Sequence, residues 1–293
     1  MPDFLARLNQ PGVRIADGAT GTMLQQAGLP RRVPPERWNL ENPVAVSRVC
    51  RSYVEAGAEI VLTNTFGGSR IRLKRDGLEA QTAEINRTAA RLAREAAGDR
   101  ALVIGDMGPT GELLDPLGPL SYAEVVSAFA EQAAALAESG VDALAIETLS
   151  DLQEAKAALE GARQASTTLP ILVSFSFDTR GRTMMGVKPA DAARAIWPLG
   201  VTALGANCGR TLSETLAAIQ AMRQAVPEAT LMAKPNAGLP RVEDDGASVY
   251  DVTPEIMADY ALRFAEQEVK IFGGCCGSTP AHIQAIAARL RSR

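Results

Sequence analysis

Eight short apolar runs alternate with helical segments along the chain, and this alternation constrains the fold more than any other feature. Each run is too short and too continuously apolar for an amphipathic helix. Continuous runs are typical of strands in a parallel sheet that is covered on both faces. The predicted strands are Val13–Asp17, Glu59–Thr65, Ala101–Asp106, Ala143–Thr148, Ile171–Phe177, Ala203–Cys208, Thr230–Asn236 and Lys270–Cys276.

Segments with helical spacing separate these runs. They are Pro43–Ala56, Ala80–Ala97, Tyr122–Ser139, Asp151–Gln164, Pro189–Leu199, Leu212–Val226, Pro254–Glu266 and Pro280–Arg291. Eight strand–helix units in 293 residues predict one (β/α)8 barrel that occupies the whole chain, residues 1–293. A doubly wound sheet is the alternative, but it usually has fewer strands and a Gly-x-Gly-x-x-Gly fingerprint, which this sequence lacks.

Charge and hydropathy exclude several classes of partner. The 30 basic and 34 acidic residues give a net charge of −4, so we expect no nucleic-acid surface. No apolar stretch is long enough to span a bilayer, and none at the N-terminus is typical of a signal peptide, so we expect a cytoplasmic protein. The single histidine, His282, rules out a His-rich metal site, and we expect it at the surface.

Three of the four cysteines fall at predicted strand ends. Cys208 ends the sixth strand, and Cys275 and Cys276 end the eighth. In a barrel only the seventh strand separates the sixth strand from the eighth, so the three thiols can meet at the mouth. Three thiolates suit Zn²⁺ and leave one coordination position open, which is the pattern of a catalytic site. Small buried core residues or a redox pair are the alternative interpretations. Cys50 lies within a helix, where we expect it in the core.

The charge of such a site indicates its chemistry. Zn²⁺ with three thiolates carries a net charge of −1, which weakens it as an activator of water. It suits a fourth thiol, which loses its proton on coordination and becomes a nucleophile. We therefore expect alkyl transfer to sulfur. A hydrolase with a metal-bound water and a non-catalytic zinc- or thiol-binding module remain the alternatives from other classes.

Several motifs in order resemble the homocysteine S-methyltransferase family. They are Asp17-Gly-Ala-Thr-Gly-Thr, Thr63-Asn-Thr-Phe, Gly108-Pro-Thr-Gly, Glu147-Thr, Gly205-Ala-Asn-Cys-Gly, Pro235-Asn-Ala-Gly and Gly273-Gly-Cys-Cys-Gly. The resemblance implies a (β/α)8 barrel, Zn²⁺ as cofactor, and homocysteine as the methyl acceptor that becomes methionine.

The resemblance also implies roles for individual residues. Zn²⁺ would be held by Cys208, Cys275 and Cys276, and Asn236 would lend an oxygen when the acceptor is absent. Asp17 and Glu147 would hold the amino group of homocysteine. The other expected acceptor-side residues are Gly18, Ala19 and Asn207, and the expected donor-side residues are Trp38, Thr65, Phe66 and Gly67.

The methyl donor is less constrained. Gly67 and Thr148 stand where vertebrate-type betaine enzymes carry tyrosines, so an aromatic cage of that type is not expected. The small Gly67-Gly68 mouth favours a large partner, a corrinoid protein that supplies methylcobalamin or a related methylcorrinoid. Betaine or S-methylmethionine remains the alternative, since Thr110–Leu114 and Arg182–Gly186 also occur in bacterial sequences labelled as betaine enzymes. The roles of Asp106, Asp178 and Lys234 stay open.

Overall fold

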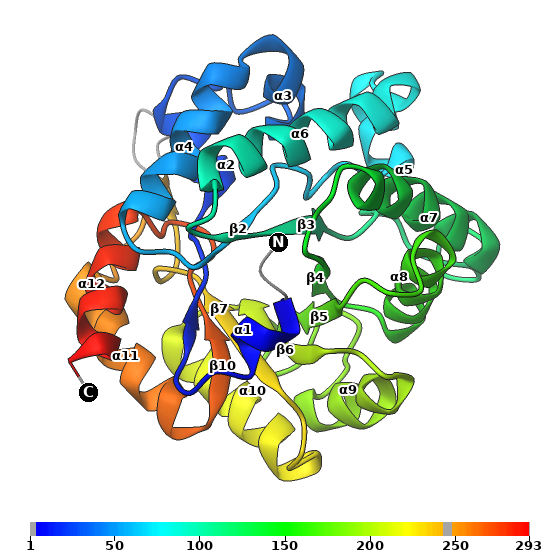
Figure 1. Cartoon of the computed structure of the whole chain (residues 1–293). Coiled ribbons are helices and arrows are strands. Elements are labelled where there is room, and N and C mark those ends of the chain that lie inside the picture. The colour runs from blue at the N-terminus through cyan, green and yellow to red at the C-terminus, as the bar shows by residue number, and fades with distance from the viewer. Residues whose placement is uncertain (1–3, 243–247, 293) are drawn as a thin grey trace.

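Eight parallel strands form the centre of the protein (Figure 1). The computed structural model describes residues 4–242 and 248–292. The sheet order is β1-β10-β7-β6-β5-β4-β3-β2, and a parallel bridge between Ala16 and Ile60 joins its two ends. The strands are β1 (Arg14–Ile15), β2 (Ile60–Leu62), β3 (Leu102–Met107), β4 (Ala143–Leu149), β5 (Ile171–Phe175), β6 (Ala203–Cys208), β7 (Leu231–Pro235) and β10 (Val269–Phe272). The prediction of a (β/α)8 barrel is confirmed.

Helices surround the barrel and alternate with its strands, except for α1, which lies across one opening, as Figure 1 shows. They are α1 (Phe4–Leu8), α2 (Thr20–Gln26), α3 (Trp38–Glu41), α4 (Pro43–Glu55), α5 (Arg70–Leu73), α6 (Thr82–Ala97), α7 (Tyr122–Glu138), α8 (Leu152–Ala165), α9 (Pro189–Ile196), α10 (Leu212–Ala225), α11 (Pro254–Glu266) and α12 (Pro280–Arg291). Short 3-10 turns are η1 (Pro35–Arg37), η2 (Lys74–Asp76), η3 (Glu79–Gln81) and η4 (Trp197–Leu199), and β8 (Arg241–Val242) pairs with β9 (Ser248–Val249).

The hydrophobic core has two layers. One large cluster lies between the strands and the surrounding helices, and a smaller cluster fills the barrel interior. Phe4 and Leu8 of α1 belong to the interior cluster, and Figure 1 shows α1 across the opening of the barrel. The N-terminal end of the barrel is therefore plugged by apolar side chains, and the functional groups collect at the opposite end.

β6 has the predicted bounds, but the predicted strands around β2 and β10 extend beyond the observed ones at their C-terminal ends. Thr63–Thr65 follows β2, and residues 273–276 follow β10. A turn takes over from the ladder after β2, since the backbone N–H of Thr65 donates to the carbonyl of Thr63 at 2.9 Å. Asp17, Thr63 and Thr65 consequently lie in the segments that follow β1 and β2, whereas Glu147 and Cys208 lie within β4 and β6 as predicted.

His282 is not a surface residue, and that expectation is wrong. It is 7% exposed and lies in the first turn of α12. Nδ1 accepts the backbone N–H of Thr279 at 3.1 Å, and Nε2 lies 2.9 Å from the carbonyl oxygen of Val252. The ring is buried because it caps α12 and ties it to the segment before α11.

In the described part of the chain, no helix combines the length and apolar character that a membrane span requires.

Candidate active site

Three cysteines meet at the C-terminal end of the barrel because β6 and β10 both flank β7. Cys208 is the last residue of β6 and has a φ of 56°, a left-handed conformation that is costly outside glycine. The backbone N–H of Cys275 donates to the carbonyl of Pro235 at 2.8 Å, and that of Ala237 donates to the carbonyl of Cys276 at 2.9 Å. These bonds attach the cysteine turn to the end of β7.

Glycines allow the two adjacent cysteines to face the same cluster. A Cβ atom at Gly274 would overlap the side chain of Ser278, and Gly277 has a φ of 79°. Neighbouring residues of an extended strand point to opposite faces, so this turn is required for both thiols to converge.

The three thiols form one cluster. The sulfur atoms of Cys208, Cys275 and Cys276 all lie within 4.8 Å of one another, and Sγ of Cys208 is 2.9 Å from Sγ of Cys275. Hydrogen bonds from the other two thiols lower the pKa of Cys276 to about 3, so one thiolate is stable in the cluster. Nδ2 of Asn207 lies 3.9 Å from two of the sulfurs.

Asn236 adds an oxygen that lacks a partner. Its Nδ2 donates to the carbonyl of Gly209 at 2.8 Å, but its Oδ1 is buried without a hydrogen bond to any described residue. The backbone N–H of Asn236 donates to the carbonyl of Cys208 at 3.3 Å, so the residue lies beside the thiol cluster. Three soft sulfur ligands with a nearby free oxygen fit the ligand set of a zinc site.

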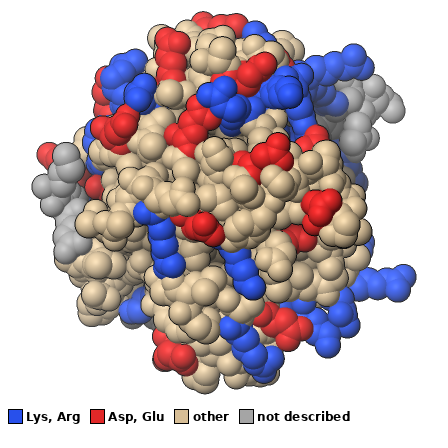
Figure 2. Space-filling view, turned by 90° about the vertical axis from the view of Figure 1, so that its right-hand side faces the viewer, with Lys and Arg blue, Asp and Glu red and all other residues tan. Residues whose placement is uncertain are grey.

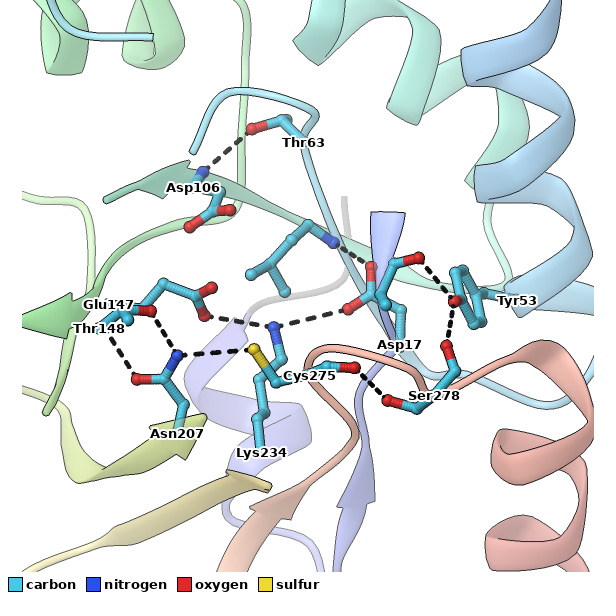
Figure 3. A network of polar contacts seen from close by, with 12 residues as sticks. Asp17, Tyr53, Thr63, Asp106, Glu147, Thr148, Asn207, Lys234, Cys275 and Ser278 are labelled. Atoms are coloured by element: carbon cyan, nitrogen blue, oxygen red, sulfur yellow. Dashed lines mark hydrogen bonds and ion pairs between the residues drawn. The ribbon is translucent and has the colours of Figure 1, made fainter. Parts of the chain in front are cut away.

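A buried lysine joins the carboxylates next to the thiols (Figure 3). Nζ of Lys234, on β7, lies 3.2 Å from Oε2 of Glu147 and 3.8 Å from Oδ1 of Asp17. Burial raises the pKa of Asp17 to about 6, against the opposing effects of Lys234 and of the N–H of Leu62. Burial alone would lower the pKa of Lys234, but the surrounding carboxylates raise it, so the lysine stays charged.

A cavity of about 450 Å³ connects these groups to the outside. Its inner wall includes Asp106, Glu147, Lys234 and the three clustered cysteines, and its rim includes Arg31, Arg32, Arg72 and Arg75. Phe66 is the aromatic residue among the described lining residues. The cavity is therefore acidic inside, basic at the rim, and poor in aromatic side chains.

The family model for homocysteine S-methyltransferases matches residues 14–290, which is nearly the whole barrel. The chain belongs to the homocysteine S-methyltransferase family. It is 34% identical over 304 residues to the methionine synthase of Mycobacterium tuberculosis and 34% identical over 305 residues to that of Mycobacterium leprae. Each match covers 98% of this chain and 25% of the relative, so the chain spans about a quarter of those proteins.

A solved member of the homocysteine S-methyltransferase family has a similar barrel along its full length. The metallated form of the homocysteine methyltransferase MmuM from Escherichia coli is 27% identical, with a TM-score of 0.81. The match covers 97% of this chain and 98% of MmuM. The similarity to MmuM therefore extends over the whole cavity-bearing barrel.

The barrel brings most of the residues expected from the homocysteine S-methyltransferase resemblance to one place. Those that line the cavity are Gly18, Ala19, Phe66, Gly67, Glu147, Cys208, Cys275 and Cys276. Asp17 lies behind this wall, where it is 2% exposed and accepts the N–H of Leu62 at 2.8 Å. Asn207 also lies behind it, hydrogen-bonded to Thr148 and Ser174.

Two expected donor-side residues do not line the cavity. Trp38, in α3, packs against the large hydrophobic cluster. Thr65 is fully buried, and its hydroxyl donates to the carbonyl of Asp106 at 2.7 Å. Their side chains therefore support the loops around the mouth.

Glu36 is a site residue that the sequence did not reveal. It is 3% exposed, lines the cavity, and accepts the backbone N–H of Gly67 at 2.6 Å. A Cβ at Gly67 would lie 3.0 Å from this carboxylate. The contact ties the connection before α3 to the loop after β2, and no local sequence pattern indicates such a long-range bond.

Proposed function

We propose that the protein transfers a methyl group from an activated donor to the thiol of homocysteine, which becomes methionine. The observation that carries this proposal is the thiol cluster beside a buried carboxylate–lysine cluster in one cavity. A metal-bound thiol and an amino acid head group can be held there together. Membership of the homocysteine S-methyltransferase family supports the same acceptor, as does the similarity to a methionine synthase and a homocysteine methyltransferase.

We infer that Zn²⁺ is the cofactor and that Cys208, Cys275 and Cys276 hold it. The unpartnered oxygen of Asn236 is the candidate for a further ligand when no acceptor is present. When bound by three thiolates, Zn²⁺ favours the deprotonated form of an added thiol and keeps its sulfur nucleophilic. The MmuM structure in its metallated form is consistent with a metal in this family.

The remaining acceptor-side residues orient the amino acid. Glu147 lines the cavity and Asp17 lies directly behind it, so both add negative charge where a substrate ammonium group would bind. Gly18 and Ala19 present backbone at the cavity wall without a bulky side chain. Asn207 holds Thr148 in a left-handed conformation, with a φ of 66°, at the end of β4.

The reaction requires a simple displacement. The acceptor sulfur attacks the methyl carbon, the new S–C bond forms, and the leaving group departs with its electron pair. The protein contributes proximity and alignment, which are worth several orders of magnitude in rate. No side chain has to move a proton during methyl transfer, which agrees with the location of His282 outside the cavity lining.

We propose a methylcorrinoid protein as the donor. A quaternary ammonium donor is expected to need an aromatic cage, and Phe66 is the one aromatic residue among the described lining residues. Arginines at the rim would attract an acidic partner surface. Figure 2 shows Lys and Arg side chains mixed with Asp and Glu side chains over one face of the molecule, so the proposed attraction rests on the rim arginines themselves.

A donor screen tests this proposal. Zinc-loaded protein is incubated with homocysteine and, separately, with a methylcorrinoid protein, free methylcobalamin, betaine or S-methylmethionine, and methionine is measured by mass spectrometry. Turnover with the corrinoid donors and none with the two small onium compounds is expected. Turnover with betaine alone would overturn the corrinoid assignment. No methionine from any donor, with zinc bound and homocysteine retained, would instead favour a non-catalytic thiol-binding module.

A further inference from the structure

Asp106 is a buried carboxylate in the cavity wall, and one of its oxygens has no hydrogen bond to a described residue. It lies on β3, is 6% exposed, and forms part of the cavity wall. Its Oδ1 is buried and has no hydrogen bond to any described residue. Figure 3 shows the carboxylate directed toward the side of the barrel where Glu147 and Lys234 lie. A carboxylate buried in this way is costly unless a cation or donor reaches it.

The buried charges around Asp106 are unbalanced, with more carboxylates than cations. Three buried carboxylates, Asp17, Asp106 and Glu147, surround one buried ammonium group, that of Lys234. Lys234 forms ion pairs with Glu147 and Asp17, and it interacts with Asp106 only through its charge at longer range. Burial and the neighbouring Glu147 together raise the pKa of Asp106 well above its usual value. The cluster therefore has fewer cations than carboxylates, and a ligand cation would offset part of the excess negative charge.

Asp106 and Asp17 differ in whether a ligand in the cavity can reach them. Asp106 and Glu147 line the cavity, whereas Asp17 is not among its lining residues and its Oδ2 accepts the N–H of Leu62. A ligand in the cavity meets Glu147 and Asp106 first. Lys234 already offsets part of the negative charge of Glu147, so Glu147 alone is a weak site for a second ammonium group.

We propose that Asp106 binds the α-ammonium group of the acceptor and thereby determines that the acceptor is an amino acid and not a simple thiol. With Asp106, three carboxylates serve two ammonium groups, one from Lys234 and one from the ligand. A charge-assisted hydrogen bond to a buried carboxylate is stronger than a neutral one. This inference rests on the proposed homocysteine acceptor and assigns a further residue to it.

Two ligands and two matched variants test the inference. Homocysteine and 4-mercaptobutyrate, which lacks only the amino group, are titrated by calorimetry into metal-loaded wild type, Asp106→Asn and Asp76→Asn. Asp76 lies at the rim of the same cavity, so its variant removes the same charge away from the inner wall. We expect Asp106→Asn to weaken homocysteine binding roughly ten- to a hundredfold and to leave 4-mercaptobutyrate binding unchanged. Asp76→Asn is expected to change neither.

The outcomes separate this inference from the proposed function. Equal loss of both ligands in Asp106→Asn, or unchanged homocysteine affinity, would overturn the role of Asp106. Absence of homocysteine binding to wild type, by contrast, would remove the proposed function itself. Unfolding temperature and metal content are measured for every variant. If Asp106→Asn does not fold, Asp106→Ser is measured in its place, with the same expected selectivity for the amino group.

Discussion

The ammonium group of Lys234 lies 3.2 Å from a carboxylate oxygen of Glu147, and both side chains are at most 6% exposed. Both charges are almost completely shielded from water, so each depends on the other. Removing one partner of a buried ion pair leaves an uncompensated charge and costs about 3–5 kcal/mol.

Lys234→Met is therefore expected to lower the free energy of unfolding by ~3–5 kcal/mol in urea titrations. Adding Glu147→Gln in the same chain should recover part of that loss, because one unpaired carboxylate disappears. Lys188→Met, at an exposed lysine, is the control and should change the free energy of unfolding little. A single variant as stable as wild type would show that the lysine charge is not needed to hold the carboxylates.

The thiol cluster predicts which cysteines hold metal. Cys208→Ser, Cys275→Ser and Cys276→Ser are each expected to lose bound zinc, because a hydroxyl is a poor substitute for a thiolate ligand. Cys50→Ser should keep its zinc, since Cys50 packs against the core in α4. Elemental analysis after dialysis and the charge-transfer band of the cobalt-substituted protein provide two readouts. Full zinc content in any of the three variants would contradict the ligand set.

The hydrogen bond between Glu36 and Gly67 predicts that a mutation at Glu36 affects binding of the methyl donor but not binding of homocysteine. Glu36→Ala leaves the buried N–H of Gly67 without its acceptor, at a cost of about 1–3 kcal/mol. We expect the mouth to loosen, so the KM for the donor rises while acceptor affinity stays the same. Glu41→Ala is the control, because its ion pair with Arg37 is exposed and contributes little. A rise in the dissociation constant of homocysteine would argue against this division of the cavity.

Glu154 predicts how stability depends on pH. Burial raises its pKa above the usual 4.5, and its bonds to Thr110 offset only part of that effect. Between the unfolded and folded pKa values the folded chain binds more protons, so the free energy of unfolding falls as pH rises through this window. Glu154→Gln does not titrate and keeps an oxygen for Thr110.

The stability of Glu154→Gln relative to wild type should consequently increase in urea titrations as pH rises above the ordinary glutamate pKa of 4.5. Glu95→Gln, which affects an exposed pair with Arg91, should run parallel to wild type. A relative stability that decreases with pH would mean that the environment of Glu154 favours its charged form.

Much of the fold is predictable because its signals are local. Continuous apolar runs mark the strands, and a capping box formed by Ser121 and Glu124, three residues apart in the sequence, marks the start of α7. The meeting of Cys208 with Cys275 follows from strand order alone. Glycine-rich motifs then mark the loops after the strands, so the thiol cluster can be predicted from the order of the residues.

The rest depends on contacts between distant segments. Trp38 lies in a four-residue helix, and only the packing of that helix decides whether the ring faces the core or the cavity. His282 is buried because Val252, thirty residues away, offers a carbonyl to it. Lys234 interrupts an apolar strand, which indicates a buried charge. Its partners are Asp17, just after β1, and Glu147 on β4, and the sequence of β7 cannot predict them.

The left-handed backbone of Cys208 has an evolutionary consequence. Glycine would adopt that conformation without strain, whereas cysteine carries a cost of about 1–3 kcal/mol there. Selection for stability alone would favour glycine at this position, so drift in a lineage that loses the need for the metal should erase Cys208 before Cys50. The residue type at position 208 thus distinguishes descendants that still bind the metal from those that keep only the barrel fold.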